Sequence, residues 1–525
     1  MRTLYQNGRV LTMDTAMPLA EAFIVDRDRI LAVGAAAELE HVLAAGDRRV
    51  DLLGRTVIPG LIDAHVHFSW FAYNLIDVDL DGAASLEEAL DLVRDRVART
   101  PGGGWVRGHG FNANLWERWP TARDLDRVAP CHPVMLSSKD AHSVWVNSMV
   151  MRLAGVTAAT ATPAGGNIMR DQSGEPTGVF QENANRLVTA VAPRRTQAEL
   201  QDALRLGLRY ANQMGVTSVH DMDGVDCFRG LQALHARGEL TVRFFKQVNE
   251  GDLDAALAAG LTTGFGDEWL RIGCAKLFAD GSLGSQTAHM LDSFEERPGY
   301  LGVPTHTPES LRELVTRAVQ GDMAVAVHAI GDAANRMVLD VLEDLAPLSR
   351  ARGLRHRIEH AQLLTEEDIP RFAELGVIAS VQPSHAPSDR YIADQFWGTR
   401  SRYAYAFRSL LRAGARLAFG SDVPVEPLDP LAGLHAAIWR KRLTEPESES
   451  WYPEERLSLA EALYGFTVGA AYASGEEHLK GSISIGKLAD FVVLDRDLGN
   501  GEEEVLRNIK PEATVVGGRV VFGEV

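Results

Sequence analysis

Two histidines stand two residues apart in the segment VIPGLIDAHVHF, at positions 65 and 67. The segment is typical of a buried strand, and side chains two apart on a strand point to the same side. His65 and His67 would then face one way, with Asp63 behind them. Neighbouring imidazoles suit a divalent metal ion, whereas a hydrophobic core accommodates unpaired polar rings poorly. The pair therefore predicts a metal site, with further ligands at the ends of other strands.

Four more residues with metal-binding or basic side chains lie at or near the ends of other predicted strands: Lys276, His328, His360 and Asp422. Each alone has an ordinary structural explanation, because a lone histidine near a strand end is often structural and Gly-Ser-Asp is a common turn. Together with the first two histidines they make six such residues on five strand ends, which chance explains poorly. Imidazole and carboxylate ligands are typical of zinc and similar divalent metals.

The middle of the chain alternates short apolar runs with helical segments, which predicts parallel β/α architecture. We expect an α/β protein with a TIM-type (β/α)8 barrel over residues 57–477, whose active site lies at the C-terminal ends of the strands. One helix is predicted over 196–214, where Thr196 and Glu199 form a capping box. The predicted barrel strands span residues 61–67, 218–222, 242–248, 272–278, 324–330, 356–361, 377–382 and 417–420.

Both ends of the chain carry short strands around turn signals. Asn7-Gly8 and Gly517-Gly518 each separate two apolar runs, a pattern that predicts two-residue hairpins. We expect residues 1–56 and 478–525 to form one small β-sandwich. The alternative is two unrelated hairpins.

A long stretch, about residues 68–195, separates the first two barrel strands and is rich in glycine, proline and tryptophan. A single crossover does not need this much chain. We expect an inserted subdomain after the first barrel strand, placed to cover the mouth of the active site. Its aromatic residues would either line the pocket or form the small core of the insertion: Trp105, Phe111, Trp116 and Trp119.

Composition narrows the class of protein. Hydrophobic residues make up 46% of the chain and charged residues 24%, as in ordinary globular enzymes. The net charge of -18 argues against nucleic acid or an anionic membrane surface as a partner. Three cysteines are too few for a disulfide framework, and neither a signal peptide nor a spanning segment is evident, so we expect a cytoplasmic protein. A homodimer stays open as the commonest assembly.

With these residues in view, the chain resembles the amidohydrolase superfamily of metal-dependent hydrolases, in its YtcJ-like branch, amidohydrolase family 3. The resemblance covers nearly the whole chain. HxH alone is a weak signal, whereas the ordered set of motifs is highly specific. The motifs are PGLIDAHVH (59–67), DAHSVWVNS (140–148), GGNIMRDQSGEPTGVFQE (165–182), KLFADGSLGS (276–285), HAIGD (328–332), RIEHAQ (357–362), SVQPSHA (380–386), FGSDVPVEPLDP (419–430) and GSISIGKLADFVVLD (481–495).

The resemblance implies a role for each candidate ligand. His65 and His67 would bind the more buried metal with Asp422, and His328 and His360 would bind a second one. Lys276 matches the position where many members carry a lysine carbamylated by carbon dioxide, which bridges two metals. The implied cofactor is one or two Zn²⁺, with iron, manganese or cobalt as alternatives.

The implied reaction is hydrolysis of a non-peptide, amide-type C–N bond in a small molecule by metal-bound hydroxide, since a divalent ion lowers the pKa of water toward about 7. Asp422 would act as general base and then as general acid. Two alternatives stay open: hydrolysis of a cyclic amide, carbamate or ester on the same scaffold, and a non-catalytic binding relative. Intact ligands count against the second.

Four residues are predicted to contact substrate, each with a structural alternative. His142 lies in the inserted segment and would either enter the pocket or brace the insertion. His220 ends the second barrel strand, where a structural role explains it equally well. Gln382 and His385 follow the seventh strand and are predicted to line the pocket.

Overall fold

The computed structural model describes residues 2–139, 142–163 and 165–525. Asp140 and Ala141, which begin one of the motifs, lie outside the described residues. The chain divides into two compact units. One comprises Met1–Phe68 and Gly207–Val525, and the other comprises Ser69–Leu206.

The larger unit contains the predicted barrel. Its eight strands pair in parallel in the order β21-β20-β19-β18-β17-β16-β15-β8, and an isolated parallel bridge between Val66 and Val423 joins the two ends of the sheet. The expected (β/α)8 fold is therefore confirmed. The strands are β8 (Leu61–Val66), β15 (Val216–Asp221), β16 (Arg243–Asn249), β17 (Leu270–Phe278), β18 (Val325–Ala329), β19 (Arg357–His360), β20 (Ile378–Val381) and β21 (Arg416–Phe419).

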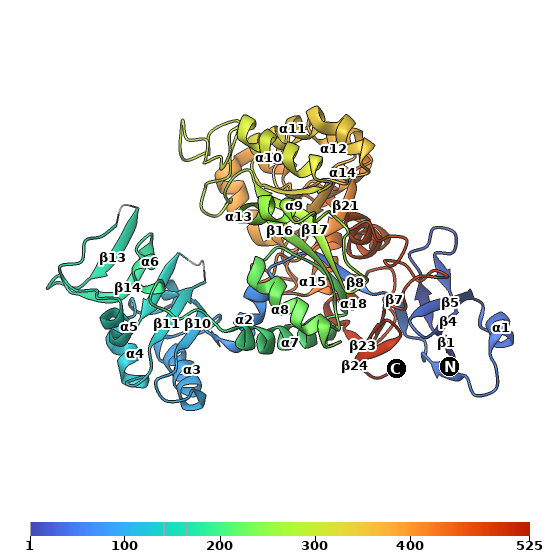
Figure 1. Ribbon diagram of the computed structural model, residues 1–525, viewed down its shortest axis with the longest axis horizontal. Helices are drawn as coiled ribbons and strands as arrows, with labels where there is room; N and C mark the ends of the chain where they lie inside the picture. The colour runs from blue at the N-terminus through green and yellow to red at the C-terminus, as the bar shows by residue number, and fades with distance from the viewer. Residues whose placement is uncertain (1, 140–141, 164) are drawn as a thin grey trace. The chain divides into compact units, whose positions relative to one another are not determined.

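The barrel strands are short apolar runs because helices cover their outer face. Figure 1 shows β16 and β17 with the helices α8, α9 and α11 around them. The predicted capping box is present, since Thr196 N donates to Glu199 Oε2 (2.7 Å) and Glu199 N donates to Thr196 Oγ1 (3.2 Å). The helices that follow the insertion are α7 (Gln197–Gln213), α8 (Val225–Ala236), α9 (Leu253–Ala258), α10 (Pro308–Gln320), α11 (Asp332–Ala351), α12 (Ile369–Leu375), α13 (His385–Trp397), α14 (Phe407–Arg412), α15 (Pro430–Trp439), α16 (Leu459–Tyr464) and α17 (Ala470–Ala473).

Two further sheets hold the strands from the chain ends. One runs β24-β23-β22-β7-β2-β3 and the other β5-β4-β1-β6, so strands from both termini, red and blue in Figure 1, share a sheet. A joint β region of the two termini is therefore confirmed, while its predicted residue limits stay predictions. Its strands are β1 (Arg2–Gln6), β2 (Arg9–Leu11), β3 (Leu19–Ala20), β4 (Ala22–Asp26), β5 (Arg29–Gly34), β6 (Arg48–Asp51), β7 (Thr56–Pro59), β22 (Phe491–Leu494), β23 (Pro511–Val516) and β24 (Arg519–Gly523); the helices are α1 (Ala36–Leu39) and α18 (Glu503–Asn508).

The two predicted hairpins have different outcomes. Gly517-Gly518 joins the antiparallel pair β23 and β24, as expected. The prediction of a hairpin at Asn7-Gly8 was wrong, because β1 and β2 lie in different sheets. The segment 48–59 runs beside both, and its strands β6 and β7 pair in parallel with β1 and β2. Pairing with this distant segment outweighs the local turn preference.

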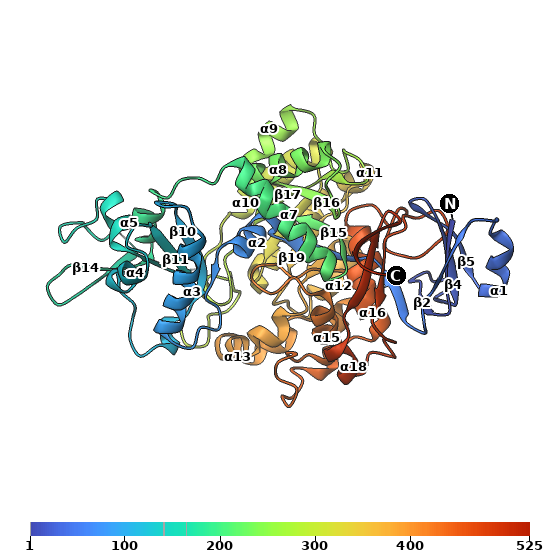
Figure 2. The same cartoon turned by 90° about the horizontal axis from the view of Figure 1, so that it is seen from below.

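The smaller unit is built on a six-stranded sheet in the order β13-β14-β12-β11-β10-β9. Helix α3 packs on β10 and α5 on β11 (Figure 2). The ring centres of Phe111, Trp116 and Trp145 lie within 6.0 Å of one another in its core. Phe111 and Trp116 therefore belong to the small core of the insertion, which was the alternative to lining the pocket. Placement of this unit over the active site stays a prediction. Its elements are β9 (Val78–Asp79), β10 (Val106–Phe111), β11 (Val134–Ser138), β12 (Ser143–Val146), β13 (Gly166–Arg170) and β14 (Pro176–Glu182), with α2 (Phe68–Ile76), α3 (Leu86–Arg99), α4 (Ala122–Val128), α5 (Ser148–Leu153) and α6 (Asn185–Thr189).

Among the described residues, no helix combines the length and the apolar character that crossing a bilayer requires.

Candidate metal centre

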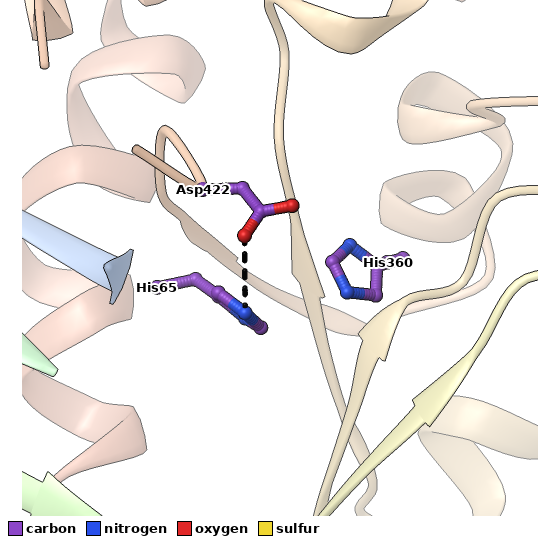
Figure 3. A group of neighbouring side chains, drawn as sticks. All are labelled: His65, His360 and Asp422. Atoms are coloured by element: carbon purple, nitrogen blue, oxygen red, sulfur yellow. Dashed lines mark ion pairs between the residues drawn. The ribbon is translucent and has the colours of Figure 1, made fainter. Parts of the chain in front are cut away.

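The C-terminal ends of the barrel strands bring three predicted ligands together. His65 lies near the end of β8, His360 ends β19, and Asp422 follows β21. Each offers a ligand atom, and these atoms lie within 4.8 Å of one another (Figure 3). All three side chains are buried. The arrangement suits a divalent ion, because parallel strands of a barrel deliver their last side chains to a single rim.

Asp422 lies between the two histidines of the HxH motif. Its Oδ1 is 3.5 Å from His65 Nε2 and 3.6 Å from His67 Nε2. The dashed line in Figure 3 marks the contact with His65. One carboxylate oxygen therefore faces the same nitrogen on each ring.

The other two histidines complete a cluster of four rings. The ring centre of His360 lies 4.6 Å from that of His328 and 4.8 Å from that of His65. Burial lowers the pKa of His328 to about 3, and the charge of Lys276 adds to the effect. The imidazole of His328 is therefore neutral near pH 7, as a metal ligand must be.

Carboxylates hold the rings of the HxH pair. His65 Nδ1 donates to Glu359 Oε2 at 2.6 Å, and His67 Nδ1 donates to Asp223 Oδ1 at 3.0 Å. A carboxylate only accepts, so the proton lies on Nδ1 of both rings and the lone pair on Nε2. These are the nitrogens that face Asp422.

Neutral groups hold the other pair. His360 Nδ1 donates to Gln382 Oε1 at 2.8 Å, and His328 Nε2 donates to the carbonyl oxygen of Gly281 at 2.8 Å. The ligating nitrogen of His360 would thus be Nε2, and that of His328 would be Nδ1.

A divalent ion fits these residues for two reasons. Hydrogen bonds on the far side of each ring fix its tautomer and orientation, as is usual around metal-binding histidines. In addition, His65 Nε2 is buried without a hydrogen-bond partner in the part of the chain that the structure describes. A buried nitrogen lone pair without a donor costs free energy, which a cation would offset.

Lys276 lies in β17 and is almost fully buried, as its apolar neighbours predicted. Burial lowers its pKa to about 8, although the charges of Glu359 and Asp422 oppose this. Its Nζ lies 4.8 Å from the ring centre of Phe278. A lysine with this pKa is partly uncharged near neutral pH, the form that can react with carbon dioxide. Its carbamylation stays a prediction.

The backbone is strained where two of these side chains leave their strands. His360 has φ +73°, Ala361 has φ +40° and Asp422 has φ +60°, all in the left-handed region. Such conformations cost non-glycine residues about 1–3 kcal/mol each and persist where the surrounding structure imposes them. Strain at two candidate ligands supports a functional demand on how they are aimed.

Sequence reasoning missed Glu359 and Asp223, which orient His65 and His67. Glu359 is held in turn by Arg357, whose Nε and Nη2 donate to its two carboxylate oxygens. Arg357 and Glu359 alternate in a strand buried at every position. Two charged residues on one side of such a strand are a detectable signal, because charges are rarely buried unless paired. Asp223 carried no comparable signal.

The residues predicted to contact substrate occupy different surroundings. Gln382 is buried against His360, and His385 Nε2 lies 3.9 Å from Asp422 Oδ2. His220 is fully buried and accepts a hydrogen bond from Arg357 Nη1 at 2.7 Å, an arrangement typical of a structural residue. Their roles toward substrate stay predictions.

His142 belongs to the smaller unit. Its Nδ1 lies 3.0 Å from Glu182 Oε1, and both side chains are exposed. Its contact with substrate is also still a prediction.

A second group of potential ligands consists of Asp221, Asp223 and Cys227, whose atoms also lie within 4.8 Å of one another. Lys246 Nζ lies 3.1 Å from Asp221 Oδ2 and already balances that charge. Asp223 is engaged by His67. Of this group, Asp223 is the member that contacts the HxH pair.

Relatives of the chain match nearly its whole length. Residues 48–522 match the profile described as amidohydrolase family. The protein LONG AFTER FAR-RED 3 of Arabidopsis thaliana is 36% identical over 99% of this chain and 91% of its own length. YtcJ of Bacillus subtilis is 30% identical over 99% of both chains. An N-substituted formamide deformylase of Arthrobacter pascens is 30% identical over 98% of this chain and 96% of its own.

The fold has a solved counterpart. The crystal structure of an uncharacterized metal-dependent hydrolase from Pyrococcus furiosus superposes with a TM-score of 0.80 at 28% identity, covering 95% of this chain and 99% of that one.

Proposed function

The chain belongs to the amidohydrolase family, and we propose that it hydrolyses a non-peptide, amide-type C–N bond of a small molecule with a divalent metal ion. The observation that carries this proposal is the buried group His65, His360 and Asp422 at the strand ends. The similarity to an N-substituted formamide deformylase over nearly the whole chain supports the choice of bond.

The resemblance to the family, rather than the distances, assigns the proposed ligands to two ions. His65, His67 and Asp422 would hold one ion and His328 and His360 a second, with Lys276 as a shared ligand if it is carbamylated. When bound, such an ion lowers the pKa of water toward about 7 and polarises a carbonyl oxygen. Imidazole and carboxylate donors favour Zn²⁺, with iron, manganese or cobalt as alternatives.

Asp422 is the residue proposed to move the proton. Its carboxylate would take a proton from the attacking water and deliver it to the leaving nitrogen. Burial raises the pKa of Asp422, while His385 and His67 oppose the shift. General acid–base help of this kind contributes about 10²–10⁴-fold to the rate.

The other residues of the site would orient the histidine ligands and contact the substrate. Glu359 and Gln382 fix the planes of His65 and His360, so the lone pairs stay aimed without rotamer freedom. His385, whose Nε2 lies 3.9 Å from Asp422 Oδ2, would contact the substrate or the departing group.

The test is a hydrolysis screen of zinc-loaded enzyme on N-substituted formamides, N-acyl amines, cyclic amides, carbamates and esters, with release of the amine or alcohol as readout. We expect turnover of an acyclic amide, with formamides as the leading class, that a chelator abolishes and added zinc restores. Turnover confined to esters or carbamates would reassign the bond. No turnover of any class by enzyme with bound metal would contradict the proposal.

A further inference from the structure

A cavity of about 690 Å³ lies at the end of the barrel away from the candidate metal centre. Its wall includes Arg243, the first residue of β16, and Trp269, which directly precedes β17. These are N-terminal strand ends, whereas the candidate metal ligands lie at C-terminal ends. The cavity has the size of an ordinary small-molecule site, for which about 300–1,000 Å³ is typical.

Two turns of the terminal β region complete the wall, and glycines let them approach closely. Gly518 joins β23 to β24 with φ +71°, and a Cβ there would lie 1.9 Å from the carbonyl oxygen of Arg27 in the turn between β4 and β5. A Cβ on Gly517 would lie 3.4 Å from Arg243 Nη2 and 4.0 Å from Trp269 Cζ2. The lack of a side chain at Gly517 therefore keeps the space beside this arginine open.

Arg243 is almost fully buried and does not use all of its donors. Its Nε and Nη2 donate to Asp490 at 2.7 Å and 3.0 Å, and its Nη1 donates to the carbonyl oxygen of Glu268 at 3.0 Å. A guanidinium group has five N–H donors, so two have no acceptor within residues 2–139, 142–163 and 165–525. A buried donor without an acceptor costs free energy, which an oxyanion in the cavity would offset.

Two further arginines line the cavity from the terminal β region. Arg27 and Arg519 are exposed, and neither side chain forms a hydrogen bond or ion pair with the part of the chain that the structure describes. The carboxylates in the wall, Asp28 and Glu268, are both paired with Arg29. The cavity therefore offers positive charge that the protein itself does not neutralise, although the whole chain has a net charge of -18.

We propose that this cavity binds a small organic anion. Its phosphate or carboxylate group lies among Arg27, Arg243 and Arg519, because the guanidinium fork matches the geometry of both oxyanions. Its flat, apolar body lies against Trp269 and Leu240, which also line the cavity. The site is separate from the proposed chemistry. Its occupant connects the terminal β region to the barrel and stabilises the folded chain by mass action.

The experiment is a calorimetric titration of the zinc-loaded full chain at low ionic strength with four probes. Phenylphosphonate and benzoate carry the two candidate anionic groups on one ring, inorganic phosphate lacks the ring, and benzyl alcohol lacks the charge. We expect the ring-bearing anions to bind more tightly than inorganic phosphate, and benzyl alcohol not to bind. The tighter of phenylphosphonate and benzoate identifies the anionic group. The thermal unfolding temperature should rise with its concentration.

Variants separate this cavity from the zinc, which also attracts oxyanions. Arg27→Gln and Arg519→Gln should each weaken binding of the ring-bearing anions by about tenfold or more, since each removes a charge-assisted hydrogen bond. Trp269→Leu should weaken binding of phenylphosphonate and leave that of inorganic phosphate unchanged. The matched control is Arg412→Gln, at an exposed arginine that ends α14 outside the cavity wall. Thermal unfolding without ligand shows whether each variant folds.

The results that would overturn the inference are distinct from those that bear on hydrolysis. Equal affinity of wild type, Arg27→Gln and Arg519→Gln would assign the binding to the metal centre and refute the cavity as its site. No binding of any anionic probe would refute it as well. Inorganic phosphate that binds as tightly as phenylphosphonate would refute the role given to Trp269. The proposed hydrolysis stands or falls separately, by the substrate screen.

Discussion

Two histidine–carboxylate pairs, one in each compact unit, have similar contacts and different surroundings. His65 and Glu359 in the barrel lie 2.6 Å apart with 1% and 0% of their side chains exposed. His142 and Glu182 in the smaller unit lie 3.0 Å apart with 46% and 58% exposed. The barrel pair has an arginine behind it and an aspartate in front. The other pair faces solvent.

The comparison shows that a contact distance does not measure how much an interaction contributes. In water, an ion pair gains little because both partners are already well solvated. Inside a protein, each charge loses that solvation, so every remaining partner becomes necessary. The barrel pair can therefore hold a ring rigidly, and the exposed pair cannot.

The largest effect is expected at the carboxylate in front of the barrel pair. Asp422→Asn removes the proposed proton carrier and should lower kcat by about 10²–10⁴-fold. In excess zinc, the zinc content and the thermal unfolding temperature should stay near those of wild type, because the amide keeps the shape and one ligand oxygen. The measurement is steady-state kinetics on whichever substrate the screen identifies. Near wild-type turnover would remove Asp422 from its role.

The second prediction concerns the arginine behind the pair. Arg357→Met leaves the carboxylate of Glu359 buried without its guanidinium partner and should lower the free energy of unfolding by about 3–5 kcal/mol. Denaturant titration of the full chain gives the value. A loss below about 1 kcal/mol would place the barrel pair in the same class as the exposed one.

The third prediction uses pH, at a barrel histidine outside the metal centre. Burial lowers the pKa of His356 from 6.5 to about 4. Between these values the unfolded chain binds a proton that the folded chain does not, so stability falls as pH falls from 6.5 to 4. One such proton changes the free energy of unfolding by about 1.4 kcal/mol per pH unit.

His356→Gln should reduce that slope by about one proton, because glutamine does not titrate. It can still accept from Val325 N and donate to Ser349 Oγ, as the histidine does. The control is His142→Gln, which changes an exposed histidine of the smaller unit. Equal slopes for wild type and His356→Gln between pH 4 and 6.5 would refute the prediction.

The smallest effect is expected at the exposed pair itself. Glu182→Gln should change the free energy of unfolding by about 0–1 kcal/mol, since solvent screens the pair. Denaturant titration beside Arg357→Met makes the contrast direct. A loss of unfolding free energy comparable to that of Arg357→Met would mean that the exposed pair stabilises the smaller unit as much as the buried pair stabilises the barrel.

Much of the barrel and its candidate ligands followed from local patterns. Each candidate ligand lies at or beside the end of an apolar run, and such a run is visible within a few residues. The partners of those ligands are a different matter. Glu359 meets His65 across 294 positions of sequence, and Asp223 meets His67 across 156. No periodicity connects residues that far apart in sequence, so these contacts could not be predicted from it.

The turn at Asn7-Gly8 failed for a related reason. Its residues suit a hairpin, and Asn7 does adopt the left-handed conformation that such a turn requires. The strands on either side nevertheless pair with β6 and β7, more than 35 residues on. Local preference selected the bend, and the competition between possible strand partners selected the sheet.

The sequence by itself determined the order of the β/α units, the strand ends at which the candidate ligands lie and the family to which the chain belongs. These features depend on hydrophobic periodicity and on motifs, which are local. Only the tertiary structure decided which nitrogen of each histidine is held and by which acceptor. It also decided how deeply each charged side chain is buried. Hydrogen bonding and desolvation depend on what surrounds an atom in space, and closing the barrel brings residues from distant strands into those surroundings.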